Sequence, residues 1–341
     1  MRRAEAGDAA AQTDFGYLYF SGAGGMPKDY AKALFWFRKS ADQNFARGFD
    51  CIGSFYEMGL GGLPKDPVKA LSLFQKAAMM GNPWGEYNLG RFLRNGTAGN
   101  RIDLAGAAAL FQKAAEQDHG LSQLSLATMY DRGEGVQNNP VTAVYWYRKA
   151  AAKGIAWAQT GLGDMLRDGR GCVRNLAEAA HMYSLAADQG DAGARTSLAG
   201  FYLSGEGVPQ ADPRRAMALL RAAAEGGYPA AEYNYGVALE LGQAGQVDYR
   251  GALNWYLKAA QANNGEAMNQ IGSMIERGRV HDASLGNAAD WFWRAGQSGS
   301  LRGSQNWYAI THQQRQTQTG RPAWEEPLDP HYCLTTLAGG C

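Results

Sequence analysis

Large apolar residues recur along the chain at helical spacing, and one small residue follows them at regular intervals. The pairs are Phe15-Gly16, Ile52-Gly53, Leu89-Gly90, Leu126-Ala127, Leu162-Gly163, Leu198-Ala199, Tyr235-Gly236 and Ile271-Gly272. The steps between the small residues are 37, 37, 37, 36, 36, 37 and 36. A period of this length is typical of proteins built by repeating one supersecondary unit.

A second marker runs in phase with the first. In each repeat an alanine stands four residues after Asp, Asn or Ser, at Ala33, Ala70, Ala107, Ala143, Ala179, Ala216, Ala252 and Ala288. The preceding polar residues are candidate helix caps, and Asp66-Pro67 and Asn139-Pro140 add proline at the first helical position. In the last repeat we expect Ser284 to stand in for the acidic cap.

Each repeat therefore predicts two helices joined by a glycine loop. Leu126, Met129 and Tyr130 have the spacing of one helical face. A loop such as 133–136 follows, and the second helix ends in an alanine pair and a glycine. Small residues at fixed positions let neighbouring helices approach closely, and glycine supplies the positive φ needed at helix ends.

A hairpin of about 36 residues cannot bury its apolar face alone, but stacked hairpins can. We therefore expect an all-α fold, a right-handed superhelical α-solenoid of about eight helical hairpins plus a C-terminal cap helix. The predicted parts are a polar lead-in (1–7), eight repeats (8–298), a capping helix (299–318) and a Pro- and Cys-containing tail (319–341). The alternative, two or three separate globular domains, conflicts with a period that never breaks.

The repeat resembles the Sel-one-like repeat (SLR) family, a relative of the tetratricopeptide repeats. The resemblance covers about residues 8–298 and is carried by Leu-Ala-Thr-Met-Tyr-Asp-Arg-Gly-Glu-Gly-Val (126–136), then Ala143, Trp146, Tyr147, Lys149 and Ala150-Ala151. It implies all-α hairpins and a protein-binding scaffold. Most members of the family serve as adaptors in bacterial assemblies and signalling, and some have been linked to enzymatic activity on cell-wall-related compounds.

Composition narrows the classes of partner. Lys plus Arg is 33 and Asp plus Glu is 32, so the net charge is +1, without the basic excess of a nucleic-acid binder. The longest apolar run, 105–111, is far shorter than the roughly 18 residues of a membrane span. We expect a protein or peptide partner, no nucleic acid, no membrane span, no cofactor and a monomer on its own.

The sequence contains no recognisable catalytic or metal-binding motif. Its four cysteines form no CxxC or Cys/His zinc spacing. Cys51 and Cys172 are expected to be free, while Cys333 and Cys341 either are free or form a disulfide, which would need an oxidising compartment. His119 lies in a connection and is expected at the surface. HExxH, GxSxG and Walker-type sequences are missing, so we expect no enzyme.

Binding is expected on the first helices, which line the concave surface in a stacked hairpin solenoid. Counting from the small residue, the open positions are −6, −3, +1 and +4. Tryptophan, tyrosine and arginine are enriched at binding hot spots, and guanidinium groups suit carboxylates on a partner. The candidate partner-binding residues at these positions are Trp84, Tyr87, Arg91, Arg94, Trp157, Asp164, Arg167 and Tyr233. The alternative is that each tryptophan fills a gap between repeats.

Four other tryptophans share one position of the second helix and are expected to pack: Trp36, Trp146, Trp255 and Trp291. The predicted function is a non-enzymatic scaffold or adaptor that holds a partner protein in its concave groove, one version being an inhibitor or immunity protein. The alternative is an enzyme acting on a cell-wall-related substrate. Because residues 1–7 carry no apolar leader, we expect either a periplasmic protein whose signal peptide is absent from this chain or a cytoplasmic protein.

Overall fold

The computed structural model describes residues 1–99, 101–243 and 245–319, the backbone alone over 314–319. Every regular element in these ranges is helical, and no strand occurs in them. The predicted all-α fold is therefore confirmed. The chain divides into two compact units, Met1–Asp191 (unit 1) and Ala192–Cys341 (unit 2), which are described separately.

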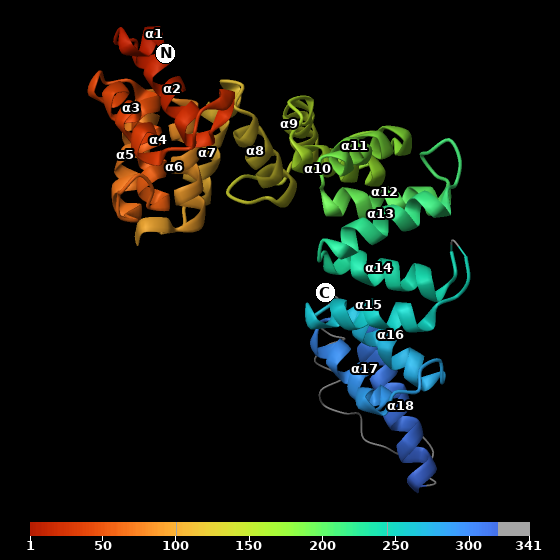
Figure 1. The fold of residues 1–341 in the computed structure, drawn as a ribbon. Coiled ribbons are helices and arrows are strands. Elements are labelled where there is room, and N and C mark those ends of the chain that lie inside the picture. Colours follow the sequence, from red (N-terminus) through yellow and green to blue (C-terminus); the bar gives the residue numbers. More distant parts are fainter. Residues whose placement is uncertain (100, 244, 320–341) are drawn as a thin grey trace. The chain divides into compact units, whose positions relative to one another are not determined.

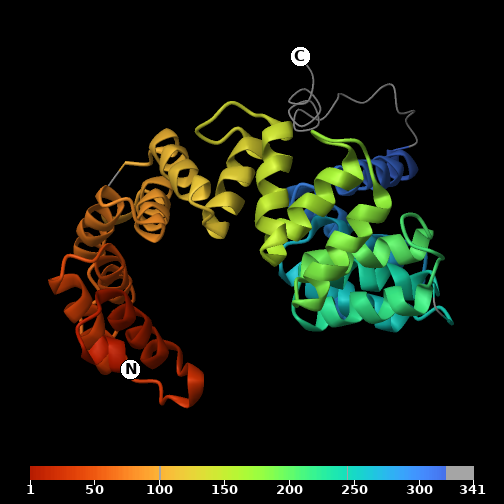
Figure 2. The ribbon, with the colours of Figure 1, turned by 90° about the horizontal axis from the view of Figure 1, so that it is seen from above.

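Unit 1 holds a short leading helix and five helical hairpins (Figures 1 and 2). The leading helix is α1 (Arg2–Glu5), and the hairpins are α2 (Ala9–Ser21) with α3 (Tyr30–Asp42), α4 (Ala46–Met58) with α5 (Pro67–Met79), α6 (Pro83–Asn95) with α7 (Leu104–Glu116), α8 (Gly120–Arg132) with α9 (Pro140–Ala152), and α10 (Ala156–Asp168) with α11 (Leu176–Asp188). Single 3-10 turns, η1 (Ala23–Gly25) and η2 (Thr97–Gly99), lie in two of the loops.

Unit 2 continues the pattern with three hairpins and a final helix (Figure 1). They are α12 (Ala192–Ser204) with α13 (Pro213–Glu225), α14 (Pro229–Glu240) with α15 (Tyr249–Gln261), α16 (Gly265–Glu276) with α17 (Ala288–Gln297), and α18 (Leu301–Thr319), with the 3-10 turn η3 (Ala283–Leu285) before α17. Helix α18 packs on both helices of the hairpin before it, where a capping helix was predicted.

The helix boundaries follow from the predicted caps. The side chain of Asp66 accepts a hydrogen bond from the Lys69 amide at the start of α5, and Asn139 does the same for Thr142 at the start of α9. These side chains satisfy amides that the first turn of a helix leaves without a partner. At the other end of α4, Gly59 closes the helix at φ 71°, a left-handed conformation that favours glycine.

An aromatic ring of the second helix packs directly on the small residue of the first. A Cβ atom built on Gly90 would lie 2.8 Å from the Phe111 ring, and one on Gly53 would lie 2.7 Å from the Phe74 ring. Both rings are fully buried. The predicted role of the small residues, close approach of two helices, is therefore confirmed at these positions.

One detail of the sequence prediction was wrong. Ser284 does not cap the second helix of the last hairpin, because it lies in the turn η3 and α17 begins at Ala288, four residues after it, capped by Asn287. The polar lead-in of residues 1–7 includes one short helix. Its residues 2–5 form α1, and Ala4 is 1% exposed, so this turn of helix covers the start of the first hairpin.

Candidate functional site

Three first helices of unit 1, α6, α8 and α10, line an open hollow of about 450 Å³, which we call the central hollow. Earlier in unit 1, α2 contacts α4 directly and α4 contacts α6, whereas α6, α8 and α10 pack less closely on one another. The wider spacing leaves room for the hollow. Its lining is Tyr87, Arg91, Arg94, Asn95, Phe111, Leu121, Leu124, Ser125, Thr128, Arg132, Tyr147, Trp157, Thr160, Gly161, Asp164 and Asp191.

Five of the eight predicted residues meet in the central hollow, although they come from repeats three and five. They are Tyr87, Arg91, Arg94, Trp157 and Asp164. The sequence analysis missed the residues that repeat four contributes between them. Leu121, Leu124 and Thr128 occupy the same register positions, −6, −3 and +1, so applying the register to every repeat would have found them.

Trp157 is the most exposed aromatic side chain of the hollow, with 72% of its surface accessible. It lies in the first turn of α10. An indole ring carries a large apolar surface and loses little conformational entropy on binding, which is why tryptophan so often anchors an interface. The position of Trp157 therefore offers a partner an apolar contact that the fold itself does not use.

The arginines of the hollow outnumber the carboxylates that pair with them. Arg94 and Arg132 share the single carboxylate of Glu134, at 2.8 and 3.5 Å. Arg91 pairs with Glu57 at 2.7 Å. The side of the hollow formed by α6 and α8 thus carries one positive charge more than its paired acids balance, and it suits a carboxylate on a partner.

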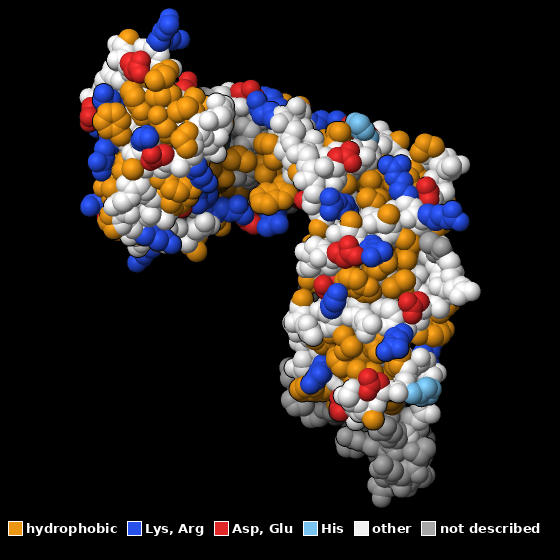
Figure 3. All heavy atoms as spheres, viewed as in Figure 1, with side chains coloured by type: hydrophobic (Ala, Val, Ile, Leu, Met, Phe, Trp, Pro, Cys, Tyr) orange, Lys and Arg blue, Asp and Glu red, His pale blue; other side chains and the backbone are white. Residues whose placement is uncertain are grey.

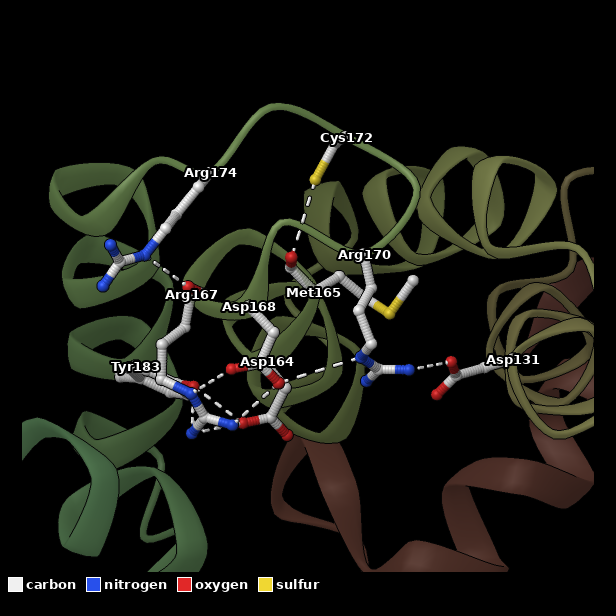
Figure 4. A network of polar contacts seen from close by, with 9 residues as sticks. All are labelled: Asp131, Asp164, Met165, Arg167, Asp168, Arg170, Cys172, Arg174 and Tyr183. Atoms are coloured by element: carbon white, nitrogen blue, oxygen red, sulfur yellow. Dashed lines mark hydrogen bonds and ion pairs between the residues drawn. The ribbon is translucent and has the colours of Figure 1, made fainter. Parts of the chain in front are cut away.

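On the α10 side, Asp164 and Arg167 belong to a polar network of their own (Figure 4). Asp164 accepts a hydrogen bond from the Tyr183 hydroxyl at 2.7 Å and pairs with Arg167 at 3.1 Å. Arg167 also donates to Asp168 at 2.7 Å, and this bond raises the pKa of Arg167 and lowers that of Asp168. Arg170 extends the network to Asp131 on α8.

Arg167 does not line the central hollow, in contrast to the prediction. The network in Figure 4 directs its guanidinium to the acids of its own helix and to Tyr183. The register alone could not show this, because Asp168 lies next to Arg167 in sequence and competes for the same guanidinium. In the structure Arg167 pairs with both Asp164 and Asp168.

Trp84 lies in a second, smaller hollow rather than with Tyr87. This hollow, the N-terminal hollow, has a volume of about 150 Å³ and lies between α2, α3, α4 and α6. Its lining is Tyr17, Phe20, Phe37, Arg47, Asp50, Cys51, Ser54, Phe55, Met58, Trp84 and Asn88. The predicted groove is therefore two hollows, with the residues of α6 divided between them.

His119 separates Trp84 from Tyr87 and is not a surface residue, so that prediction was wrong. The side chain is 7% exposed, and its ring centroid lies 4.4 Å from that of Trp84 and 5.1 Å from that of Tyr87. Its Nδ1 accepts a hydrogen bond from the Ser122 amide and so caps α8. Burial lowers the pKa of His119 to about 4, which keeps the ring neutral.

Tyr233, the eighth predicted residue, lies on α14 in unit 2. Its ring packs 5.9 Å from that of Tyr256, and burial raises its pKa. Glu240, which the same register expects to be open, is buried instead. It accepts hydrogen bonds from Tyr256 and Arg279, so it holds α14, α15 and the loop after α16 together.

The four tryptophans of the second helices pack within the fold, as the sequence predicts. Trp146 and Trp291 are buried as predicted, and Trp36 and Trp255 are half-buried. Cys51 and Cys172 are free cysteines, while Cys333 and Cys341 lie outside the described residues.

Among the residues that the structure describes, no group of three or more His, Cys, Asp or Glu is placed to hold a metal ion. None of the described helices is long and apolar enough to cross a membrane.

Charge is distributed evenly over the face drawn in Figure 3. Lysine and arginine side chains alternate there with acidic and apolar ones over both units. This view agrees with the net charge of +1 and shows no continuous basic stripe on that face. Such a stripe is the usual electrostatic footprint of a nucleic-acid binder.

Comparison with known families identifies the repeat. The Sel1 repeat model matches seven segments of the chain: 9–45, 52–82, 85–119, 120–155, 158–191, 193–228 and 229–264. The chain belongs to the Sel1 repeat family. The seven segments cover the hairpins from α2 to α15, and the eighth predicted repeat corresponds to the hairpin of α16 and α17, which the family model does not match.

Solved Sel1 structures share the fold. A protective antigen of uropathogenic Escherichia coli with an SLR fold is 33% identical, with a TM-score of 0.71 over 92% of this chain, and the chain spans 66% of its length. A Sel1 repeat protein from Oxalobacter formigenes is 28% identical, with a TM-score of 0.61, over 91% of this chain and 88% of its own. A comparison with curated proteins finds no match.

An immunity protein from Pseudomonas aeruginosa is a more distant match. It is 19% identical, with a TM-score of 0.40, over 64% of this chain and 81% of its own. A likeness this weak carries no argument about what the Sel1 repeat chain described here binds.

Proposed function

We propose that this Sel1 repeat protein binds an extended segment of a partner protein in the central hollow of unit 1. Sel1 repeat proteins are protein-interaction scaffolds. The observation that carries the proposal is the convergence of Tyr87, Arg94 and Trp157 from separate repeats on one open hollow. An exposed indole beside arginines that outnumber their acids is the composition of a binding hot spot.

The hollow suits a segment that combines an apolar side chain with a carboxylate. Trp157, together with Leu121 and Leu124, provides the apolar contacts. Because Arg94 and Arg132 share the single carboxylate of Glu134, one of the two guanidinium charges is left for the partner. Charge-assisted hydrogen bonds between guanidinium and carboxylate are strong and directional, so they would fix the register of the bound segment.

The test compares single variants in capture from a lysate of the source cells, followed by affinity measurement with each partner identified. Trp157→Ala and Arg94→Ala are expected to weaken binding, the former about 30-fold if Trp157 is a hot spot worth about 2 kcal/mol. Tyr145→Ala is the matched control, because Tyr145 is 51% exposed on the second helix α9, away from the hollow. Equal affinity of Trp157→Ala and wild type would reject the hollow as the site.

Inhibition is the more specific form of this proposal. An inhibitor or immunity protein would remove an activity of its partner on binding, whereas an assembly adaptor would leave that activity intact. Assaying an identified partner with and without the chain separates the two. The enzyme alternative, which acts on a cell-wall-related substrate, predicts turnover of peptidoglycan fragments by the purified chain and loss of that turnover on a single conservative polar substitution.

A further inference from the structure

The N-terminal hollow has a carboxylate in its wall. Asp50, on α4, is 6% exposed and lines the hollow. Its Oδ1 accepts a hydrogen bond of 2.7 Å from the side-chain amide of Asn88 on α6. Within the described part of the chain this is the one side-chain hydrogen bond of Asp50, so its other lone pairs are not taken by protein groups.

No cation of the described chain pairs with this carboxylate, although two arginines lie near it. The Arg47 guanidinium pairs with Asp14 at 3.0 Å, and the Arg91 guanidinium pairs with Glu57 at 2.7 Å. Burial raises the pKa of Asp50 to about 6, and the opposing effects of Asn88 and the two arginines do not cancel it. Burial is the largest influence on this pKa, and the ion pairs that Arg47 and Arg91 form are with other acids.

Five of the ten other lining residues are aromatic: Tyr17, Phe20, Phe37, Phe55 and Trp84. Arg47 also lines the hollow, and its guanidinium lies 5.6 Å from the Tyr17 ring centroid. Tyr17 and Trp84 are 42% and 38% exposed, so the hollow is open at their edge. Ring faces attract cations and also pack against methylene chains. A volume of about 150 Å³ accommodates one group of about the size of benzene, which is enough for a single side chain.

We propose that the N-terminal hollow binds a lysine or arginine side chain of the partner protein, with its cationic head on Asp50 and its methylene stem against Trp84. The source of the side chain rests on the proposed function, because a partner segment that lies on the first helices of unit 1 would also reach α4 and α6. The recognition chemistry itself rests on the hollow alone. The central hollow would then bind a carboxylate, and the N-terminal hollow a cation, of the same partner.

The test uses single amino-acid derivatives, so it needs no identified partner. The full chain is labelled with 5-fluorotryptophan, and the Trp84 ¹⁹F resonance is assigned with Trp84→Phe. Nα-acetyl-lysine methylamide and its arginine counterpart are titrated, with the norleucine derivative as the neutral control. Either or both basic derivatives are expected to shift the Trp84 resonance saturably, and norleucine is not.

Asp50→Asn is expected to weaken binding of the basic derivatives at least tenfold while the chain keeps its helical circular dichroism. Asp42→Asn is the matched control, since it removes the same charge from an exposed position of the neighbouring helix α3. Ser54→Met is a second variant that fills the hollow and leaves Asp50 in place, and it is also expected to abolish binding. It decides the question if Asp50→Asn does not fold.

Binding should also depend on pH with a defined sign. A cation needs the ionised carboxylate, so apparent affinity should be about tenfold lower at pH 5 than at pH 7 for a pKa of about 6. The other charged groups that face Asp50 are Arg47, Arg91 and Glu57. His119 packs on Trp84, but its pKa of about 4 keeps it largely neutral over this range.

Two results would overturn the proposal: a norleucine shift equal to those of the basic derivatives, or unchanged binding in both Asp50→Asn and Ser54→Met. Either result would leave the proposed function untouched if Trp157→Ala still weakens partner binding. Conversely, specific lysine or arginine binding together with an ineffective Trp157→Ala would keep the cation site and reject the central hollow.

Discussion

At the residue scale, the fold depends on the contact between the small residue of the first helix and one large side chain of the second. The sequence shows the period of the small residues, but it does not show what fills the space that they leave. The structure shows that Gly16, Gly53 and Gly90 each lie against a buried phenylalanine ring. In the hairpin of α12 and α13 the corresponding residues are Ala199 and Leu220, which lie in one buried cluster.

The contact between Gly90 and the Phe111 ring gives a stability prediction. Gly90→Ala should lower the free energy of unfolding by about 1–3 kcal/mol, because the new Cβ would lie 2.8 Å from the buried Phe111 ring. Adding Phe111→Leu should restore part of the loss, since it reproduces the pair of Ala199 and Leu220. Urea denaturation of the two variants checks this. A double variant less stable than either single one would show that the contact is not the cause.

His119 is the residue whose role the sequence concealed most. It follows Asp118 in a connection, and a histidine there is usually solvated. The structure buries it because its ring packs against Trp84 and Tyr87, and its Nδ1 at the same time accepts the Ser122 amide in the first turn of α8. Asn82 and Asn264 cap α6 and α16 at the equivalent position, whereas Phe45, Ile155 and Tyr228 give no side-chain cap to α4, α10 and α14.

His119 makes unit 1 sensitive to acid. Its folded-state pKa of about 4 lies below the usual 6.5, so the unfolded chain binds more protons between these values and stability falls as the pH is lowered through them. His119→Asn keeps a capping side chain and removes this titration. Between pH 7.5 and pH 4.5 the wild type should lose about 2 kcal/mol more than the variant. Equal losses in urea denaturation would contradict the buried, neutral ring.

At the element scale, the start of a second helix could be predicted wherever Asp or Asn stands four residues before the repeated alanine. The exception is α17. Ala288 keeps its place opposite Gly272, but the helix begins at Ala288 itself because Asn287 caps it. Ser284 falls in η3, where Asp282 accepts its amide. A period fixes where side chains pack, but a local cap decides where a helix starts.

The two candidate caps of α17 can be separated by substitution. Asn287→Ala should destabilise the chain by about 1 kcal/mol, because Asn287 accepts the Asp290 amide in the first turn. Ser284→Ala should change stability by less than about 0.5 kcal/mol, because its contacts are exposed. Thermal unfolding of both variants measures this. A larger loss for Ser284→Ala would favour the cap expected from the sequence.

At the scale of the whole molecule, the repeat fold could be predicted because each hairpin is specified locally and buried by its neighbours. The site could be predicted only in part. The register located Tyr87, Arg91, Arg94, Trp157 and Asp164, which the structure brings together. It could not separate Trp84 from Tyr87, because that depends on how closely successive first helices pack, which no single repeat encodes.

The central claim is that a partner lies on the first-helix face of unit 1. Its most direct test is photo-crosslinking in the source cells, with p-benzoylphenylalanine placed at position 157 in one variant and at position 145 in another. Both native side chains are exposed aromatics, on α10 and α9. The account predicts a discrete adduct with a partner protein from position 157 and none from position 145. An adduct from position 145 alone would place the partner on the other face and contradict the account.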